Sequence, residues 1–96
     1  PYYMAPEQAT GEGVDHRADL YALGVTLFQL CTGTLPFSSG DVTYQHAHAS
    51  PPDPRELEMN LPEPLATLIL QLMAKQPGER PETAAEVAEV LRDLLE

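Results

Sequence analysis

Hydrophobic residues fill almost every position from 18 to 31, so this stretch carries no polar face. The polar or small exceptions are Asp19, Gly24, Thr26 and Gln29. A helix that is apolar on nearly every face is normally buried on nearly every face. The pattern therefore predicts a central core helix from Ala18 to Cys31. It is too short and too polar for a membrane span, which takes about 20 apolar residues.

Turn-favouring residues bound this helix. Asp15 is placed to serve as its N-cap, and Gly33 stands where a left-handed C-terminal cap is expected. A loop punctuated by Pro and Gly follows, and a polar and alanine-rich stretch from Asp41 to Ala49 predicts a short helix. Three prolines in the segment Ser50 to Pro54 exclude regular helix there and predict an extended surface connection.

Two amphipathic helices are predicted in the C-terminal third. Apolar residues recur at intervals of three and four, which indicates a helix from about Pro62 to Ala74; they are Leu61, Leu65, Leu68, Ile69, Leu72 and Met73. Thr83 and Glu86 have the spacing of a capping box that begins the last helix. The apolar stripe of this last helix comprises Ala84, Val87, Leu91, Leu94 and Leu95. Because no segment alternates as a strand would, the predicted fold class is all-α, in one domain over residues 1–96.

Composition narrows the function classes. Fifteen acidic against five basic residues give a net charge of -10, which argues against binding of nucleic acid or of an anionic membrane surface by this segment. The single cysteine, Cys31, cannot form an internal disulfide. It fits a reducing compartment, so the expected location is cytoplasmic, with a membrane anchor elsewhere in the parent protein left open. No targeting leader is visible, and the start at Pro1 is interpreted as a truncation.

Four short motifs occur in a fixed order along the chain. They are YMAPE at 3–7, DLYALG at 19–24, TGTLPF at 32–37 and KQPGERP at 75–81. In this order and spacing they closely resemble the C-terminal lobe of protein kinases, and the resemblance spans essentially all 96 residues. The continuation Glu7-Gln8-Ala9 and the prolines after His46 to His48 place the nearest group among bacterial serine/threonine kinases.

The resemblance implies a partial kinase domain over residues 1–96, from the end of the activation segment to the last helix of the lobe. Its helices are expected to be a short one after the Ala-Pro-Glu triplet, the buried central helix and three further ones. Two positions depart from the family pattern: Gln76 stands where Asp is usual, and Thr26 where an apolar residue is usual. A helical threonine can return its hydroxyl to a backbone carbonyl, so Thr26 need not disable the enzyme.

The resemblance also assigns roles to residues at the N-terminal end. Pro1, Tyr2, Tyr3 and Met4 are expected to bind the substrate, as part of the loop that receives the residue after the phosphorylated one. Tyr3 favours a serine/threonine over a tyrosine kinase, in which Trp is usual. The alternative is that Tyr3 simply packs on the first short helix.

Four structural residues follow from the same resemblance. Glu7 and Arg80 are expected to form an ion pair that clamps the activation segment to the helical subdomain, the alternative being two exposed charges. Asp19, in the first turn of a buried helix, would accept hydrogen bonds from the catalytic loop and is expected to lack this main partner here. Gly24 closes the second motif and is expected to be structural.

Other chemistry has little support. His46 and His48 point to different sides of a helix and, with one distant cysteine, make no tetrahedral metal set, so both are interpreted as surface histidines. No glycine-rich phosphate loop and none of the motifs that hold ATP and Mg²⁺ in kinases occurs. ATP and Mg²⁺ are therefore expected in the parent enzyme and not on this fragment.

The predicted function is that of a kinase fragment. The parent is expected to transfer the γ-phosphate of ATP to Ser or Thr of a protein substrate, while this segment supplies the substrate-side loop and a helical scaffold and is inactive alone. Its further expected partners are the missing N-lobe and catalytic loop, with self-association through exposed apolar surface in their absence. A catalytically dead kinase-like docking module and an unrelated helical interaction domain remain alternatives.

Overall fold

The computed structural model describes residues 1–11 and 13–95, in which helices are the only regular secondary structure. The elements in chain order are α1 (Pro6–Thr10), α2 (His16–Thr32), α3 (Val42–His48), α4 (Pro54–Leu57), α5 (Glu63–Leu72), the 3₁₀-helix η1 (Pro77–Glu79) and α6 (Ala84–Leu95). The all-α prediction is therefore confirmed for the described residues.

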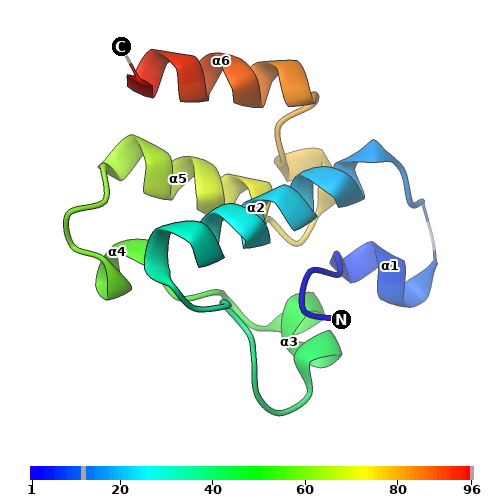
Figure 1. Ribbon diagram of the computed structural model, residues 1–96. Coiled ribbons are helices and arrows are strands. Elements are labelled where there is room, and N and C mark those ends of the chain that lie inside the picture. The colour runs from blue at the N-terminus through cyan, green and yellow to red at the C-terminus, as the bar shows by residue number, and fades with distance from the viewer. Residues whose placement is uncertain (12, 96) are drawn as a thin grey trace.

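Helix α2 crosses the middle of the molecule, and the other helices are arranged around it (Figure 1). Its most extensive packing is against α5, and α6 packs on α5 in turn. Helices α1 and α3 contact each other beside the N-terminus. This arrangement brings the first and the last of the four motifs, at 3–7 and 75–81, next to each other in the fold.

The core forms where α2 meets α5. Tyr21, Val25 and Phe28 of α2 and Ile69 and Leu72 of α5 are fully buried. At 25 cal/mol per Å², complete burial of one such large side chain contributes about 1.5–3 kcal/mol. This layer holds α2 and α5 together.

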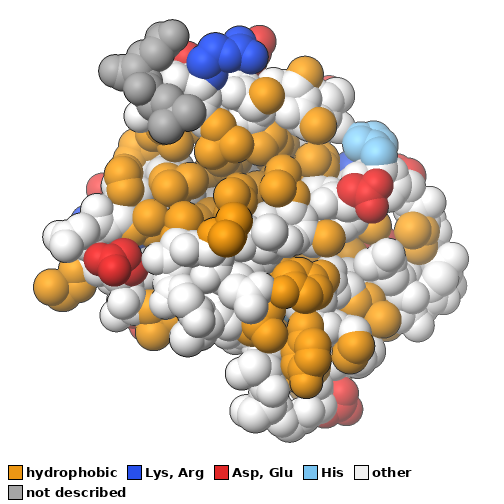
Figure 2. All heavy atoms as spheres, viewed as in Figure 1, with side chains coloured by type: hydrophobic (Ala, Val, Ile, Leu, Met, Phe, Trp, Pro, Cys, Tyr) orange, Lys and Arg blue, Asp and Glu red, His pale blue; other side chains and the backbone are white. Residues whose placement is uncertain are grey.

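The far side of α2 corrects the prediction that this helix is buried on nearly every face. Asp19 and Thr26 are exposed, Leu23 is half-buried, and Leu30 keeps 75% of its surface open. These four positions fall on one stripe at helical spacing. Among the described residues no element is packed over the whole of this stripe, and Figure 2 shows hydrophobic side chains gathered at the surface where α2, α5 and α6 meet.

The predicted caps of α2 are present. The Asp15 carboxylate accepts a hydrogen bond from the Arg17 amide at 2.9 Å, and Gly33 ends the helix with a φ of 81°. Thr26 donates its hydroxyl to the Ala22 carbonyl at 2.9 Å, as expected.

Two short elements were not predicted from the sequence. Helix α4 starts inside the segment interpreted as extended, because Asp53 caps the Arg55 amide at 2.9 Å and Pro54 occupies the first helical position. The 3₁₀ turn η1 begins at Pro77 after a Gln76 that makes no side-chain cap.

The start of α6 matches the predicted capping box in one half. The Thr83 hydroxyl accepts from the Glu86 amide at 3.2 Å, but the Glu86 carboxylate accepts from Glu82 and not from Thr83. Val87 of the predicted apolar stripe is buried, whereas Ala84 is exposed. The side chain of Leu95 lies outside the described residues. None of the described helices combines the length and the hydropathy needed to cross a membrane.

Candidate functional site: a buried ion pair beside the N-terminal loop

The Ala-Pro-Glu triplet forms the beginning of α1. Ala5 is the N-cap residue, Pro6 occupies the first helical position, and Glu7 follows in the first turn. Pro is favourable there because its missing amide would have no partner in the first turn anyway. The helix therefore begins within the triplet, and it turns the Glu7 side chain into the protein, where only 9% of the residue remains exposed.

Arg80 meets Glu7 from the other end of the chain. The guanidinium grips the carboxylate with two hydrogen bonds, Nη1 to Oε2 at 2.7 Å and Nη2 to Oε1 at 2.9 Å. The two side chains are 0% and 8% exposed. The expected ion pair is thus present in the bidentate form that suits the planar fork of Arg.

Arg80 also joins two backbone segments, one at the start of α2 and one just after α5. It donates to the carbonyl oxygens of Ala74 at 2.8 Å, Arg17 at 2.9 Å and Lys75 at 3.3 Å. Its guanidinium lies 5.0 Å from the centre of the Tyr21 ring, a distance suited to a cation–π contact. One side chain therefore links α1, the start of α2 and the segment after α5.

The electrostatics of the pair favour the ionised carboxylate. The hydrogen bonds from Arg80 lower the pKa of Glu7 below its usual value, although burial acts in the opposite direction. Because the pKa is lower in the folded state than in the unfolded chain, ionisation of Glu7 stabilises the fold above the usual glutamate range. That stabilisation is lost as the pH falls through the folded-state pKa.

We therefore expect acid to remove a specific part of the stability. Between about pH 5 and pH 3, the free energy of unfolding should fall more steeply in the native full-length protein than in a Glu7→Gln variant, which has no carboxylate to protonate at this site. Urea unfolding at a series of pH values measures both slopes. Equal slopes would show that Glu7 contributes nothing to the acid sensitivity.

The loop formed by Pro1 to Met4 lies at the surface next to this pair. Tyr2 and Tyr3 are 43% and 42% exposed. The Tyr3 hydroxyl donates to the Gln29 side chain on α2, so its polar contact is with α2 and not with the first short helix. The Tyr2 carbonyl faces the imidazole of His46, with 3.0 Å between the oxygen and Nε2.

Asp19 lies in a shallow hollow beside this loop. The hollow measures about 340 Å³ and is bordered by Pro1, Tyr3, Met4, Gln8, Ala18, Asp19 and Ala22. Asp19 is exposed, although the sequence places it in the first turn of a helix expected to be buried, so its charge is not buried without a partner. In the part of the chain that the structure describes, no hydrogen bond or ion pair to its carboxylate is found.

Gly24 lies in the contact between α2 and the end of α5. A Cβ built at this position would stand 2.7 Å from Leu72 Cβ, 2.9 Å from Met73 Cγ and 3.3 Å from the Ile69 carbonyl oxygen. Such distances are too short for any side chain. A side chain at position 24 would therefore require α2 and α5 to move apart.

His46 corrects the interpretation of both histidines as surface residues. Only 1% of His46 is exposed, whereas His48 lies at the surface against the ring of Tyr44. A sequence signal was available, because Val42, His46 and Ala49 share one face of a helix and Val42 and Ala49 pack against the core. Within the described ranges, no three His, Cys, Asp or Glu side chains come together as a metal cluster.

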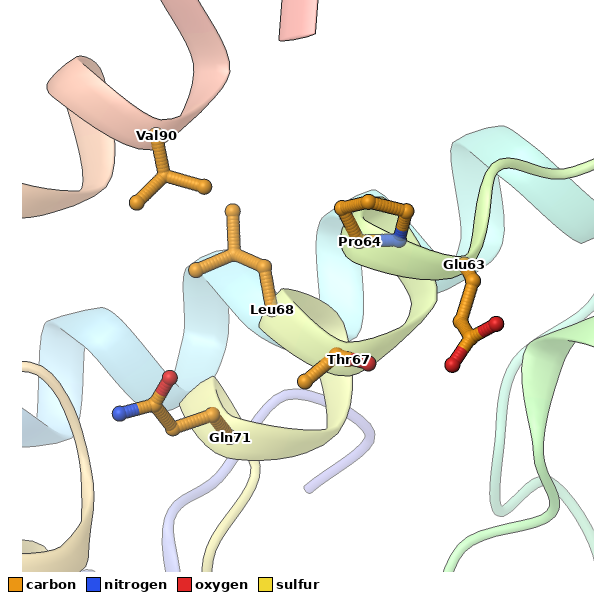
Figure 3. A pocket seen from close by; sticks show the side chains of 6 residues that line it. All are labelled: Glu63, Pro64, Thr67, Leu68, Gln71 and Val90. Atoms are coloured by element: carbon orange, nitrogen blue, oxygen red, sulfur yellow. The ribbon is translucent and has the colours of Figure 1, made fainter. Parts of the chain in front are cut away.

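Another hollow of the described surface lies away from the loop. A groove of about 430 Å³ separates α5 from α6 and is lined by Glu63, Pro64, Thr67, Leu68, Gln71 and Val90 (Figure 3). It contains none of the sequence-predicted site residues. Its one charged side chain, Glu63, is exposed and pairs with Arg55 at 3.6 Å.

Comparison with known proteins identifies the family. The family model described as "Protein kinase domain" matches residues 1–92. The chain belongs to the protein kinase family. The order of motifs, the helical architecture and the pair between Glu7 and Arg80 are consistent with the C-terminal lobe of such a kinase.

Similar curated proteins are bacterial kinases. The chain is 47% identical over 91 residues to the DNA damage-responsive serine/threonine-protein kinase RqkA of Deinococcus radiodurans, covering 92% of this chain and 14% of that protein. It is 44% identical over 89 residues to the serine/threonine-protein kinase pkn3 of Myxococcus xanthus, covering 88% of the chain and 16% of the relative. A third relative, the tyrosine-protein kinase MasK of Myxococcus xanthus, is 44% identical over 96 residues, covering 97% of the chain and 15% of the relative. The chain thus spans about a seventh of the length of the curated relatives it matches.

Proposed function

We propose that this chain is the helical subdomain of the C-terminal lobe of a bacterial serine/threonine protein kinase. The observation that carries the proposal is the buried bidentate pair between Glu7 and Arg80, which ties the Ala-Pro-Glu triplet to the segment before α6. An unrelated helical interaction module would have no reason to bury this pair.

The role proposed for residues 1–4 is contact with the protein substrate. The loop is exposed, as a peptide-binding segment must be, yet it is anchored at Tyr3 to α2 and at Tyr2 to α3. The clamp at Glu7 holds the chain immediately after it. A loop held at Tyr2 and Tyr3, and followed by the clamp at Glu7, can present one geometry to an incoming peptide, which lowers the entropic cost of binding.

The proposed reaction of the full-length protein is phosphoryl transfer. The bond between the γ-phosphorus of ATP and its bridging oxygen breaks, the γ-phosphorus bonds to a substrate hydroxyl oxygen, and ADP and the hydroxyl proton are released. The described residues offer no cluster of metal ligands. The motifs that hold ATP and Mg²⁺ in kinases do not occur in the sequence, so this proposal assigns no residue of the segment to ATP, Mg²⁺ or the chemical step.

A kinase assay on two proteins tests whether the segment is a scaffold and the catalytic residues lie elsewhere in the full-length protein. With radiolabelled ATP and a Ser/Thr peptide library, we expect the full-length protein to transfer label and the 96-residue segment alone to transfer none. Turnover by the segment would contradict the scaffold role. An inactive full-length protein would instead favour the kinase-like docking module.

The acceptor residue needs its own measurement, because one similar protein is named a tyrosine kinase. We expect phosphoserine and phosphothreonine in acid hydrolysates of the labelled substrate, since Tyr3 stands where tyrosine kinases usually carry Trp. Phosphotyrosine as the main product would overturn the assignment.

The open stripe of α2 is proposed to pack against the catalytic loop of the same kinase. Asp19, Leu23 and Leu30 present a carboxylate and apolar surface on one side of the helix. Backbone amides of a loop could satisfy the carboxylate while its side chains cover the leucines. The stripe would then be internal to the complete domain.

Expressed alone, the segment is therefore expected to self-associate. A Leu30→Glu substitution should shift light-scattering mass toward the monomer, because it introduces a charge into the apolar stripe. Met59→Glu is the matched control, since Met59 is similarly exposed, at 81% against 75% for Leu30, but lies after α4. A monomeric native segment, or equal effects of both substitutions, would contradict the proposal that the segment self-associates through the stripe of α2.

A further inference from the structure

The buried imidazole of His46 bonds to two different parts of the chain. Its Nδ1 lies 2.6 Å from the hydroxyl oxygen of Tyr21 on α2, and its Nε2 lies 3.0 Å from the carbonyl oxygen of Tyr2. Both ring nitrogens therefore have a partner. His46 itself belongs to α3, so one side chain connects α2, α3 and the N-terminal loop.

The partners fix where the ring proton is. A carbonyl oxygen can only accept a hydrogen bond, so Nε2 must carry a proton and donate to Tyr2. In a neutral imidazole, Nδ1 then has a free lone pair, and the Tyr21 hydroxyl must donate to it. Only this tautomer satisfies all three groups at once.

The surroundings keep the ring neutral. Phe37 and Tyr21 meet it edge-on, with ring centres 5.0 and 5.5 Å away. Lys75 donates to the His46 carbonyl at 2.7 Å, which places a cation close to the imidazole. Burial, with a further contribution from Lys75, lowers the pKa of His46, although the bond to Tyr2 opposes this.

The hydrogen bond from His46 to Tyr2 differs from the other hydrogen bonds of the loop. Met4 donates to the Pro1 carbonyl at 3.3 Å, which closes a turn within the loop itself. Tyr3 is held through the far end of its side chain. Across the described ranges, the contact with His46 is the hydrogen bond that ties the backbone of residues 1–4 to another element.

We propose that His46 is a positioning residue for the substrate-side loop: by donating Nε2–H to the Tyr2 carbonyl, it fixes the backbone of residues 1–4 and thereby sets the affinity for the peptide substrate. This inference rests on the proposed kinase function. His46 contacts neither substrate nor nucleotide in this scheme. Its effect should therefore appear in the KM for peptide and not in the KM for ATP.

The kinetic test uses full-length protein with His46→Leu, His46→Gln and His48→Leu. Leucine removes both hydrogen bonds of the imidazole, of which the one to Tyr2 reaches the loop. We therefore expect the peptide KM to rise about tenfold, the effect of losing that one bond to the loop, with the KM for ATP unchanged. Gln can place an amide N–H near the position of Nε2 and should restore most of the affinity. His48→Leu, on the exposed side of the same helix, should behave like the native protein.

A second measurement does not depend on activity. Hydrogen–deuterium exchange of the loop amides should be faster in His46→Leu than in His48→Leu. Long-range ¹H–¹⁵N spectra should show His46 in the Nε2-protonated form, assigned by its loss in His46→Gln.

The outcomes separate the two proposals. An active native protein whose peptide KM is unchanged by His46→Leu overturns the positioning role, as do equal changes in both KM values or the other tautomer. A native protein that phosphorylates nothing overturns the kinase function. Faster exchange of the loop in His46→Leu would even then support the anchoring of the loop.

Discussion

Replacing Arg80 by Met is expected to lower the free energy of unfolding by about 3–5 kcal/mol. The change leaves the Glu7 carboxylate buried without its partner, and an uncompensated buried charge has a cost of this size. It also removes the donor to the carbonyls of Arg17, Ala74 and Lys75. Denaturant unfolding of the full-length protein, followed by circular dichroism, measures the loss.

Two further variants make the result specific. Arg55→Met breaks the pair with Glu63, which spans 3.6 Å between side chains that are 43% and 78% exposed, so it should cost less than about 1 kcal/mol. Combining Arg80→Met with Glu7→Gln removes both charges and should cost less than the sum of the single changes. Strictly additive losses, or a loss at Arg80 no larger than at Arg55, would show that the pair is not a coupled buried unit.

The contact between Glu7 and Arg80 shows what a sequence can reveal about a long-range contact. Helical periodicity places both residues near helix ends but carries no information about partners 73 positions apart. The ion pair became predictable only through the resemblance of ordered motifs. By contrast, α5 follows directly from its apolar spacing, and the caps of α2 from the residue types that satisfy free backbone groups.

The wrong predictions also have physical causes. The continuous apolar run from 18 to 31 predicts a helix that is buried on nearly every face. The burial of each face depends, however, on which other elements pack against it. The sequence does not predict α4, because Pro51 and Pro52 favour extended backbone directly before the Asp-Pro pair at 53–54 that begins the helix. Histidine as a residue type favours the surface, but His46 shares one face of the helix with Val42 and Ala49, and this position decides its burial. Residue type alone could not show that Tyr21 and the Tyr2 carbonyl would satisfy both ring nitrogens.

A Gly24→Val substitution is expected to lower the free energy of unfolding by about 3 kcal/mol, at the upper end of typical overpacking costs. The first added carbon alone would lie 2.7 Å from Leu72 Cβ. That atom is attached directly to the backbone of α5, so a rotamer change cannot move it away. The two helices must separate, and packing between the other buried residues of α2 and α5 weakens. Gly24→Ala should cost less, because it adds one carbon and Ala favours helix by up to about 1 kcal/mol over Gly.

Gly78→Val provides the matched control for this helix contact. A Cβ at Gly78 would have no atom within 4 Å, and its φ is not in the left-handed region, so the change should stay within about 0.5 kcal/mol. Thermal and urea unfolding of the full-length protein compare the two valine variants directly. A Gly24→Val protein as stable as Gly78→Val would mean that α2 and α5 can move apart without loss. In that case the close approach of these helices would not be what requires glycine in the DLYALG motif.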